Sequence, residues 1–358
     1  MKRGIIAAVL VVGAWAAGAW GQATGGVGSA AFLRRGVDAR AMGMGGAFVA
    51  VADGYSAIYW NPAGLARAAS VEVGGMTTNI YGIDIFFNFV AGLARWDFAA
   101  GPATPSDRGA NPTAPTATDN SQQPSATPEQ TTSSLRLAVG LAWTEMSTEV
   151  LAFDEYGSPL GLIRYSEALY AGAAAVWLPR LGYLGGAVKA YSYRAPQAGV
   201  GGQDALAFGL GFDLGLAAPI WEDRLWLGLA AADVGDTGVK WRNTPTEPTD
   251  RVAARYTAGL ALIQRPLLLE DDGAVLAVDL SSEPLLGQTT VRAGLEYRLL
   301  FLAVRGGVVW RPGGLASFTA GAGVQALGIT IDGAWVQNRE VQIEGAGHTL
   351  IVSASFKF

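Results

Sequence analysis

The sequence predicts an all-β protein, a transmembrane antiparallel β-barrel of about fourteen strands. From residue 135 to the C-terminus, apolar residues alternate with small, polar or charged ones, mostly over ten residues or more, longer than the usual strand of a soluble protein. Beyond residue 22 there is no apolar run of the roughly 20 residues that a spanning helix needs. A soluble β-sandwich would show the same alternation. The last residue, Phe358, falls on an apolar strand face, which favours the membrane barrel.

The composition agrees with a membrane protein and excludes several kinds of site. Of the 358 residues, 50% are hydrophobic and 15% are charged, against about 25% charged in typical soluble domains. The net charge of -5 gives no support for a nucleic-acid partner. The absence of cysteine excludes disulfides, thiolate metal sites and a lipid-modified cysteine.

The N-terminus has the features of a signal peptide. Basic residues precede an apolar run over residues 5–19, and small residues follow. Ala19 and Gly21 satisfy the small-x-small rule, which predicts a signal peptide over residues 1–21; Ala17 and Ala19 offer a second site. A short membrane anchor is the alternative, but the run is too short to span a bilayer.

Fourteen strands are expected, an even number as in bacterial single-chain barrels. Their ranges are residues 70–80, 82–98, 134–146, 161–178, 182–195, 203–218, 223–242, 251–264, 272–282, 288–300, 301–311, 314–325, 326–338 and 346–358. The connections after the fourth, sixth, tenth and twelfth strands are short, and those after the third, fifth, seventh and thirteenth are longer and more polar. Short turns belong to the periplasmic side of such barrels and long loops to the outside.

Residues 101–133, after the second strand, form a low-complexity insert of Pro, Thr, Ser, Ala and Gln. Such a composition cannot bury enough apolar surface to order itself, so we expect disorder. The order of short and long connections places the insert in the periplasm.

The last strand carries an expected assembly signal. Phe356 and Phe358 share its apolar face with Leu350, Val352 and Ala354. Outer-membrane barrels use a terminal aromatic residue as an assembly signal. We therefore expect the barrel assembly machinery and outer-membrane lipid to be partners of this strand.

The segment DARAMGMGGAFVAVADGYSAIYWNPAGLA (Asp38–Ala66) resembles the N-terminal signature of the PorV/PorQ-like proteins. These form a branch of the FadL superfamily, named for the long-chain fatty-acid transporter (the OMPP1/TodX group). The likeness continues in LAFGLGFDLGLAA, LGLAAADVGDTGVKW, TVRAGLEYRL and the closing IVSASFKF. The resemblance implies a fourteen-stranded barrel over residues 70–358 with residues 22–69 inside it as a hatch. The insert departs from the family pattern, where a short turn is expected.

The residues of the hatch motif suit a place inside a lumen. Gly43, Gly45 and Gly46 permit positive φ and close backbone approach. Pro62 biases Asn61 toward an extended conformation, so Asn61, Pro62 and Ala63 would end a preceding helix. These residues alone would also fit an ordinary turn before the first strand; the resemblance favours the hatch.

A set of charged residues falls on the strand face opposite the apolar stripe. It comprises Arg251, Arg255, Asp279, Arg292, Glu296, Arg298, Arg305 and Asp332. At mid-depth in lipid an Arg would cost about 2–4 kcal/mol, so we expect all of them to face the lumen. Because both signs occur together, we interpret them as salt-bridge ladders between strands and around the hatch. The alternative is that some bind the carboxylate headgroup of a ligand.

No motif predicts an enzyme, a cofactor or a metal. His348 is the single histidine, and without cysteine it cannot build the usual zinc sites. No G-x-S-x-G elbow is present to offer a serine nucleophile. The run from Gly43 to Gly46 lacks the spacing and the strand–helix context of a dinucleotide fingerprint.

Three functions remain open for a barrel in the cell outer membrane. The leading prediction is a FadL-like conduit for hydrophobic small molecules, gated by the hatch. The second is a PorV-like partner of secretion-system proteins in type IX secretion. The third is a plugged structural barrel.

Overall fold

The computed structural model describes residues 29–80, 84–98, 135–153, 159–179, 181–269, 272–338 and 347–358. The predicted signal peptide, the first residues of the predicted hatch and the insert over residues 101–133 lie outside these ranges.

Strands make up most of the described chain. They are β1 (Val71–Ile80), β2 (Ile85–Phe98), β3 (Leu135–Phe153), β4 (Pro159–Leu178), β5 (Gly182–Ala195), β6 (Ala205–Trp221), β7 (Leu225–Ala232), β8 (Thr237–Arg242), β9 (Thr249–Val252), β10 (Arg255–Gln264), β11 (Asp272–Glu283), β12 (Gln288–Leu299), β13 (Leu302–Trp310), β14 (Ser317–Ala326), β15 (Ile329–Gln337) and β16 (His348–Lys357). The short helices are η1 (Ala31–Arg35), α2 (Ala39–Gly43), α3 (Ala57–Trp60), η2 (Pro62–Arg67), η3 (Val200–Gly202) and η4 (Pro284–Leu286).

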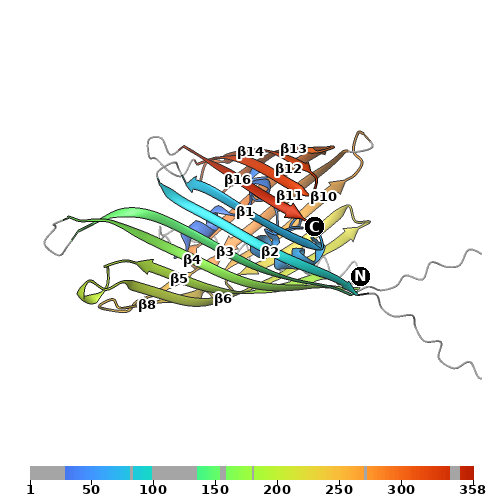
Figure 1. Ribbon diagram of the computed structural model, residues 1–358. Coiled ribbons are helices and arrows are strands. Elements are labelled where there is room, and N and C mark those ends of the chain that lie inside the picture. Colours follow the sequence, from blue (N-terminus) through green and yellow to red (C-terminus); the bar gives the residue numbers. More distant parts are fainter. Residues whose placement is uncertain are drawn as a thin grey trace, which may run out of the picture.

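The strands form one closed antiparallel barrel (Figure 1). β1 pairs with β16, and the pairing of β5 with β6 completes the ring. The first half of β6 pairs with β8 and its second half with β7, so β7 and β8 share one wall position. β9 pairs with β8 and β10 with β7, so these two share the next position. Over the described residues the wall therefore has fourteen positions, which confirms the predicted fold class.

Two breaks interrupt these shared positions. Residues 233–236 separate β7 from β8, and residues 253–254 separate β9 from β10. Val252 and Arg255 are three positions apart and would face opposite sides of an uninterrupted strand. Both line the lumen, so the alternation of side chains shifts by one residue at the second break. This corrects the expectation for Arg251, which precedes Val252 and lies on the exposed outer side of β9.

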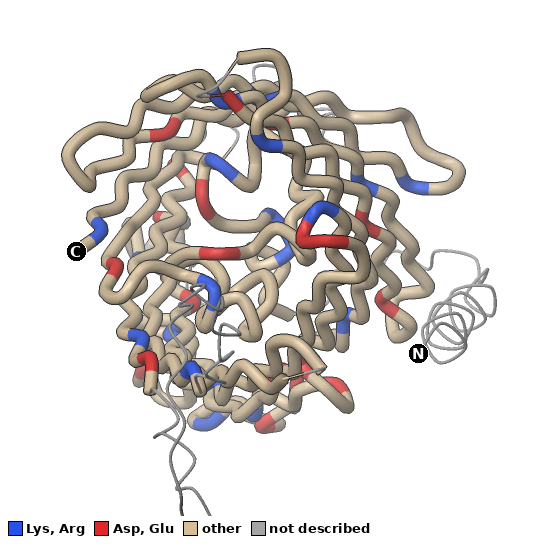
Figure 2. The backbone as a smooth tube through the Cα atoms, turned by 90° about the vertical axis from the view of Figure 1, so that its right-hand side faces the viewer, with Lys and Arg blue, Asp and Glu red and all other residues tan. Residues whose placement is uncertain are grey.

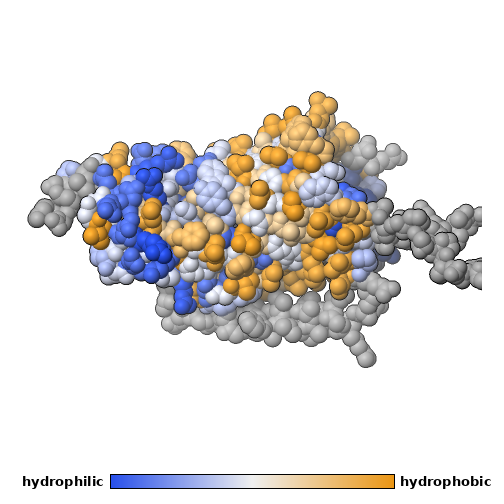
Figure 3. All heavy atoms as spheres, turned by 60° about the horizontal axis from the view of Figure 1, so that its bottom comes forward, coloured by the Kyte–Doolittle hydropathy of each residue, from blue (hydrophilic) through white to orange (hydrophobic). Residues whose placement is uncertain are grey.

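The outward side of the wall is apolar. Along β6, the outward residues Leu206, Phe208, Leu210, Phe212 and Leu214 are between 45% and 59% exposed. Figure 3 shows hydrophobic residues covering much of one face of the barrel, while hydrophilic residues gather at one end. A closed wall satisfies its backbone hydrogen bonds internally, so this surface suits lipid. No helix in the described ranges is long and apolar enough to cross a membrane.

The first described residues, 29–68, lie inside the barrel, and we call them the lumen segment (Figures 1 and 2). Its helix α2 contacts β13, β14, β15 and β16, whereas η2 contacts β2 to β6 on another part of the wall. Its apolar side chains form one core cluster with the inward side chains of the strands. The lumen segment therefore crosses the barrel and builds the core together with the inward side chains of the wall.

Candidate functional site in the barrel lumen

Asp38 fixes the first half of the lumen segment to the wall. It has a φ of 73°, and its carboxylate accepts the N–H of Arg40 (3.1 Å) at the start of α2. The same carboxylate accepts hydrogen bonds from Ser56 Oγ (2.8 Å) and from Ser353 Oγ of β16 (3.1 Å). Burial and the nearby Asp332 raise the pKa of Asp38, and these hydrogen bonds oppose the rise only in part.

The glycines of the predicted hatch motif rest on glycines of the wall. Gly45 and Gly46 have φ values of 68° and 73°, which side chains rarely allow. A Cβ on Gly307 of β13 would overlap the backbone nitrogen of Gly45, and a Cβ on Gly294 of β12 would overlap the preceding carbonyl. Gly43 also lies against the wall, at β14. Backbone packs directly on backbone at β12 and β13, which requires glycine at positions 294 and 307 of the wall.

Asn61 fixes the second half of the lumen segment and is fully buried. Its Nδ2 donates to the carbonyl of Val49 (2.8 Å) and to the carbonyl of Leu216 in β6 (2.9 Å). Its Oδ1 accepts the N–H of Ala63 (3.2 Å), which caps η2. Pro62 occupies the first turn of η2, where a missing N–H costs nothing. Both polar atoms of the buried amide therefore have partners.

Predicted lumen charges on β12, β13 and β15 meet Arg40 in one buried network. Glu296 is fully buried and lies 2.6 Å from Arg305, 2.9 Å from Arg298 and 2.9 Å from Arg40. Arg305 also lies 2.7 Å from Asp332. Removing one partner from such a network leaves a buried charge uncompensated, at a cost of about 3–5 kcal/mol. These contacts have the geometry of a salt-bridge ladder that includes the lumen segment.

Arg40 forms a second ion pair within the lumen segment. Its Nη1 lies 2.6 Å from Asp53 Oδ1. Burial would raise the pKa of the Asp53 carboxyl, but Arg40, and behind it Arg67 and Arg298, outweigh burial and hold the pKa at about 2. The Asp53 side chain keeps 34% of its surface exposed, so solvent screens part of this attraction.

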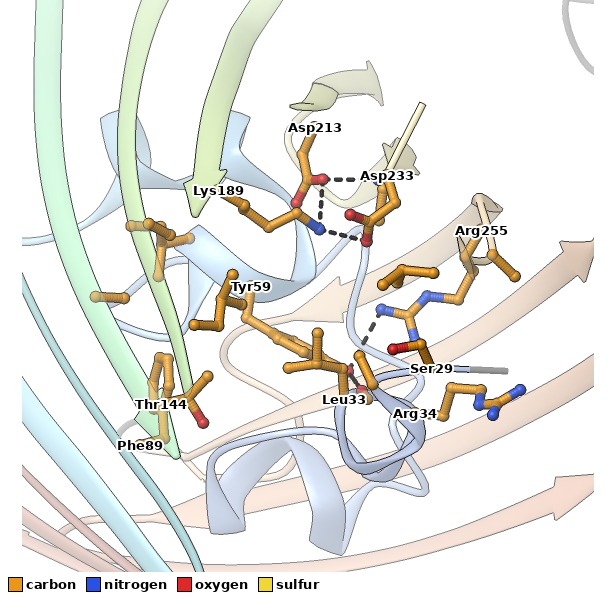
Figure 4. A pocket seen from close by; sticks show the side chains of 18 of the residues that line it. Ser29, Leu33, Arg34, Tyr59, Phe89, Thr144, Lys189, Asp213, Asp233 and Arg255 are labelled. Carbon is orange, nitrogen blue, oxygen red and sulfur yellow. Dashed lines mark hydrogen bonds and ion pairs between the residues drawn. The ribbon is translucent and has the colours of Figure 1, made fainter. Parts of the chain in front are cut away.

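A further charged cluster was not predicted from the sequence. Lys189 of β5 lies between Asp213 of β6 (2.7 Å) and Asp233 (2.5 Å), as Figure 4 shows. The hydroxyls of Tyr191 and Thr237 donate to Asp233 at 2.7 and 2.9 Å. Asp233 belongs to the break after β7, so strand alternation could not place it. The signal in the sequence that could have indicated this cluster was Lys189, a lysine among the small residues of β5.

Two adjacent cavities remain between the lumen segment and the wall. The apolar lining of the first, the apolar cavity, includes Leu33, Ile58, Phe89 and Leu169. Figure 4 shows Leu33 and Phe89 among its lining side chains. The second, the polar cavity, lies beside it and shares part of its lining. Its polar lining includes Thr257, Asp279, Ser281, Arg292 and Arg255.

Tyr59 and Arg255 are among the residues that line both cavities. Arg255 Nη2 donates to the Tyr59 hydroxyl at 3.4 Å, and its guanidinium carbon lies 5.5 Å from the centre of the Tyr59 ring. The Tyr59 hydroxyl donates in turn to the carbonyl of Leu33 in η1. A wall strand is thus linked to two parts of the lumen segment at this point.

Asp279 and Arg292 face each other across β11 and β12 but have different partners. Asp279 Oδ2 accepts the N–H groups of Phe48 (2.7 Å) and Val49 (2.9 Å), which holds the lumen segment. Arg292 Nη1 donates to Ser281 Oγ at 2.7 Å.

The C-terminal strand completes the wall. Phe356 and Phe358 lie on its outward side with ring centres 4.4 Å apart, and Phe358 is 71% exposed. The N–H of Phe358 donates to the carbonyl of Val71 in β1 (2.9 Å). His348 is exposed at the start of β16. Within the described ranges, no three His, Asp or Glu residues are grouped so as to hold a metal.

The fold is shared with several barrels of known structure. Over 90% of this chain, it is similar to a monoaromatic hydrocarbon channel, CymD, with a TM-score of 0.50, 12% identity and 98% of that chain covered. The toluene transporter TodX of Pseudomonas putida gives 0.49 and 15%, and a Pseudomonas aeruginosa FadL homologue gives 0.46 and 12%; each match covers 90% of this chain and 98% of the other. At such identities the likeness concerns the fold alone, and the CymD match carries it. No family model and no curated protein matches the chain.

Proposed function

We propose that this chain is a non-enzymatic barrel of the outer membrane that conducts hydrophobic small molecules, with the lumen segment as its hatch. The apolar cavity carries the proposal. It lies inside a wall whose outer face suits lipid, and aliphatic and aromatic side chains from both the lumen segment and the strands line it. The apolar part of this lining favours ligands with a hydrophobic body. CymD, which has a similar fold, is a monoaromatic hydrocarbon channel, and this agrees with such a ligand class.

Filling the apolar cavity tests the conduit. Leu33→Trp places a bulky ring in the cavity, whereas Leu141→Trp adds the same ring to the outer face, where Leu141 is 73% exposed. We expect proteoliposomes with Leu33→Trp to take up toluene several-fold more slowly than the wild type, and those with Leu141→Trp to match it. Equal uptake by both variants would contradict a route through this cavity.

A reversible lock tests the hatch. Gly43 of the lumen segment lies next to Gly321 of β14, since a Cβ on Gly43 would stand 3.1 Å from the Gly321 Cα. The chain has no other cysteine, so Gly43→Cys with Gly321→Cys can form only one disulfide within a molecule. We expect oxidation to slow toluene uptake and a reductant to restore it. Uptake that is the same in both states would mean that passage needs no displacement at this contact.

The close fit of the lumen segment favours a plugged structural barrel as the second candidate. Asp38, Arg40, Asn61 and the glycine contacts all hold the segment to the wall. A wild type that neither binds nor passes toluene would favour this candidate. The PorV-like role in type IX secretion rests on the sequence resemblance over Asp38–Ala66. Co-purification of secretion components with the intact barrel would support it.

A further inference from the structure

Three basic side chains lie together on the outer face of β8 and β9. Lys240 and Arg242 lie on the exposed face of β8, whose opposite face carries the buried Val239. Arg251 lies on the exposed face of β9, next to the inward Val252. We call Lys240, Arg242 and Arg251 the basic cluster. It gives a place to Arg251, which was expected in the lumen.

The register of the two strands brings these side chains together. Lys240 pairs with Thr249, and Arg251 follows two residues later on β9. On one face of an antiparallel pair, such diagonal neighbours lie about 7–8 Å apart. Arg242 follows Lys240 by two residues on the same face of β8. The three long side chains can therefore converge on one anionic group.

Most of the positive charge in the basic cluster has no counter-charge in the protein. Within the described ranges, neither Arg242 nor Arg251 has a carboxylate oxygen within 4.0 Å. Lys240 lies 3.7 Å from Glu247, and both side chains are about half exposed. An exposed pair of this kind contributes little, so Lys240 can turn to another anion.

Other charges nearby do not neutralise the basic cluster. On β5, Arg194 lies 2.7 Å from Asp204, so this pair adds no net charge to the outer face. Asp250 of β9 points to the other side of the sheet, where it accepts a hydrogen bond from Trp241 Nε1 (2.7 Å). The outer face of β8 and β9 therefore keeps a net positive charge.

The position of the basic cluster next to the apolar wall indicates a lipid headgroup. Leu206 and Phe208 of β6 pair with Arg242 and Lys240, and they begin a row of exposed apolar residues that continues to Leu214. A lipid-facing Arg or Lys is costly at the bilayer midplane and costs little near the bilayer surface. The basic cluster therefore marks the boundary between acyl chains and headgroups.

The basic cluster lies at the end of the barrel that carries long connections. Residues 243–248 join β8 to β9 directly after Arg242, and Figure 1 shows β8 at the end of the barrel away from the labelled C-terminus. Long loops belong to the outer side of such barrels. The outer leaflet of a bacterial outer membrane consists mainly of phosphorylated glycolipid.

We propose that Lys240, Arg242 and Arg251 bind a phosphate group of an outer-leaflet glycolipid, whose acyl chains lie along the apolar row of β6. A guanidinium matches phosphate oxygens with two parallel hydrogen bonds, and the lysine adds a compact positive charge. This inference goes beyond the proposed conduit, because none of the three side chains lines either cavity. It requires only that the barrel lies in the outer membrane.

Lipid binding by the detergent-solubilised full chain tests the proposal, with native mass spectrometry as the measurement. The probes are diphosphorylated lipid A and the same lipid without its phosphates. Each exposed ion pair contributes modestly, so we expect the three together to favour the phosphorylated lipid about tenfold. Equal binding of the two lipids would overturn the proposal, and the basic cluster would then fit the carboxylates of a protein partner better.

Single substitutions test the three side chains. Arg242→Gln and Arg251→Gln should each weaken binding of the phosphorylated lipid about two- to fivefold and leave binding of the phosphate-free lipid unchanged. Adding Lys240→Gln to both should abolish the preference. Arg251→Lys keeps the charge and should retain most of the binding.

Arg224→Gln is the matched control. It also removes one exposed positive charge, from the turn between β6 and β7 at the opposite end of β6, and should not affect binding of the phosphorylated lipid. An equal loss in Arg224→Gln and Arg242→Gln would overturn the proposal, because net charge rather than the basic cluster would then explain the binding. Heat-modifiable migration checks that each variant folds, and if the triple variant does not assemble, the single variants decide the matter.

Discussion

The fit of the lumen segment can be tested at two adjacent glycines of β13. Gly307 faces the lumen, and a Cβ there would overlap the backbone at Met44 and Gly45. Gly306 faces outward, and a Cβ there meets nothing within 4 Å. Gly307→Ala and Gly306→Ala therefore add the same methyl group to the same strand, one residue apart, on opposite faces.

The expected cost follows from what each methyl group meets. Overpacking of a close-packed core costs about 1–3 kcal/mol, and Gly307 has backbone rather than a flexible side chain opposite it. A shift of about 2 kcal/mol would raise the population of the displaced lumen segment about 30-fold, since 1.4 kcal/mol is a factor of ten. Gly306→Ala should be neutral or slightly stabilising, because Ala loses less backbone entropy than Gly on folding.

Limited proteolysis of the folded protein in detergent measures this population. We expect Gly307→Ala to be cleaved within the lumen segment much faster than the wild type, while its wall keeps heat-modifiable migration. Gly306→Ala should be cleaved at the wild-type rate. Equal protection of Gly307→Ala and Gly306→Ala would refute the reasoning, because the lumen segment would then not rest on β13 as described.

Other predictions concern assembly, topology, the open lumen and pH. Phe358→Ser should reduce outer-membrane assembly, and normal heat-modifiable migration of this variant would count against the predicted signal. A cysteine at Ser121, in the insert, should resist an impermeant reagent on intact cells; labelling would show the periplasmic placement to be wrong. Deleting residues 36–66 should leave a barrel that conducts ions in planar bilayers, and near-zero conductance would mean that the wall's own side chains fill the lumen. Because the pKa of Asp53 is depressed to about 2, its ion pair with Arg40 stabilises the lumen segment above pH 4 and is lost as the pH falls toward 2; protease sensitivity should rise over that interval in the wild type, and an unchanged rate would contradict the pairing.

Strand positions were predictable because the membrane imposes a regular pattern. β5 begins and ends at the residues predicted, and most other strands end within three residues of the prediction. β3 is the main exception, since it was predicted to end at residue 146 and continues to Phe153. Its extension contains Ser147, Thr148 and Glu149, which pair with β4 but no longer show an apolar face. The strands continue to pair beyond the part of the wall where lipid requires an apolar outer face. The alternation of apolar residues in the sequence therefore cannot reveal this extension.

The breaks in the wall could not be predicted for a related reason. The prediction assumed that side chains alternate without interruption between the lumen and the outer face. Residues 253–254 interrupt the strand, so the alternation begins again on the opposite face at Arg255. Arg255 lines the lumen because the residues after the break keep their own pattern, whereas Arg251, before the break, lies on the exposed outer side. Asp233 was missed because the break after β7 turns it toward Lys189.

The lumen charges show what a sequence can and cannot decide about pairing. The charged residues that line the two cavities are balanced, with four positive (Arg34, Lys189, Arg255 and Arg292) and four negative (Asp213, Asp233, Asp279 and Glu283). The interpretation as salt-bridge ladders rested on the occurrence of both signs together on the inward strand faces. Two of the carboxylates lie on one lysine, however, a third binds backbone N–H groups, and the fourth, Glu283, lies 3.7 Å from Arg34. An equal number of opposite charges therefore still leaves Arg255 and Arg292 with donors directed at a cavity, and only the positions of the carboxylates reveal it.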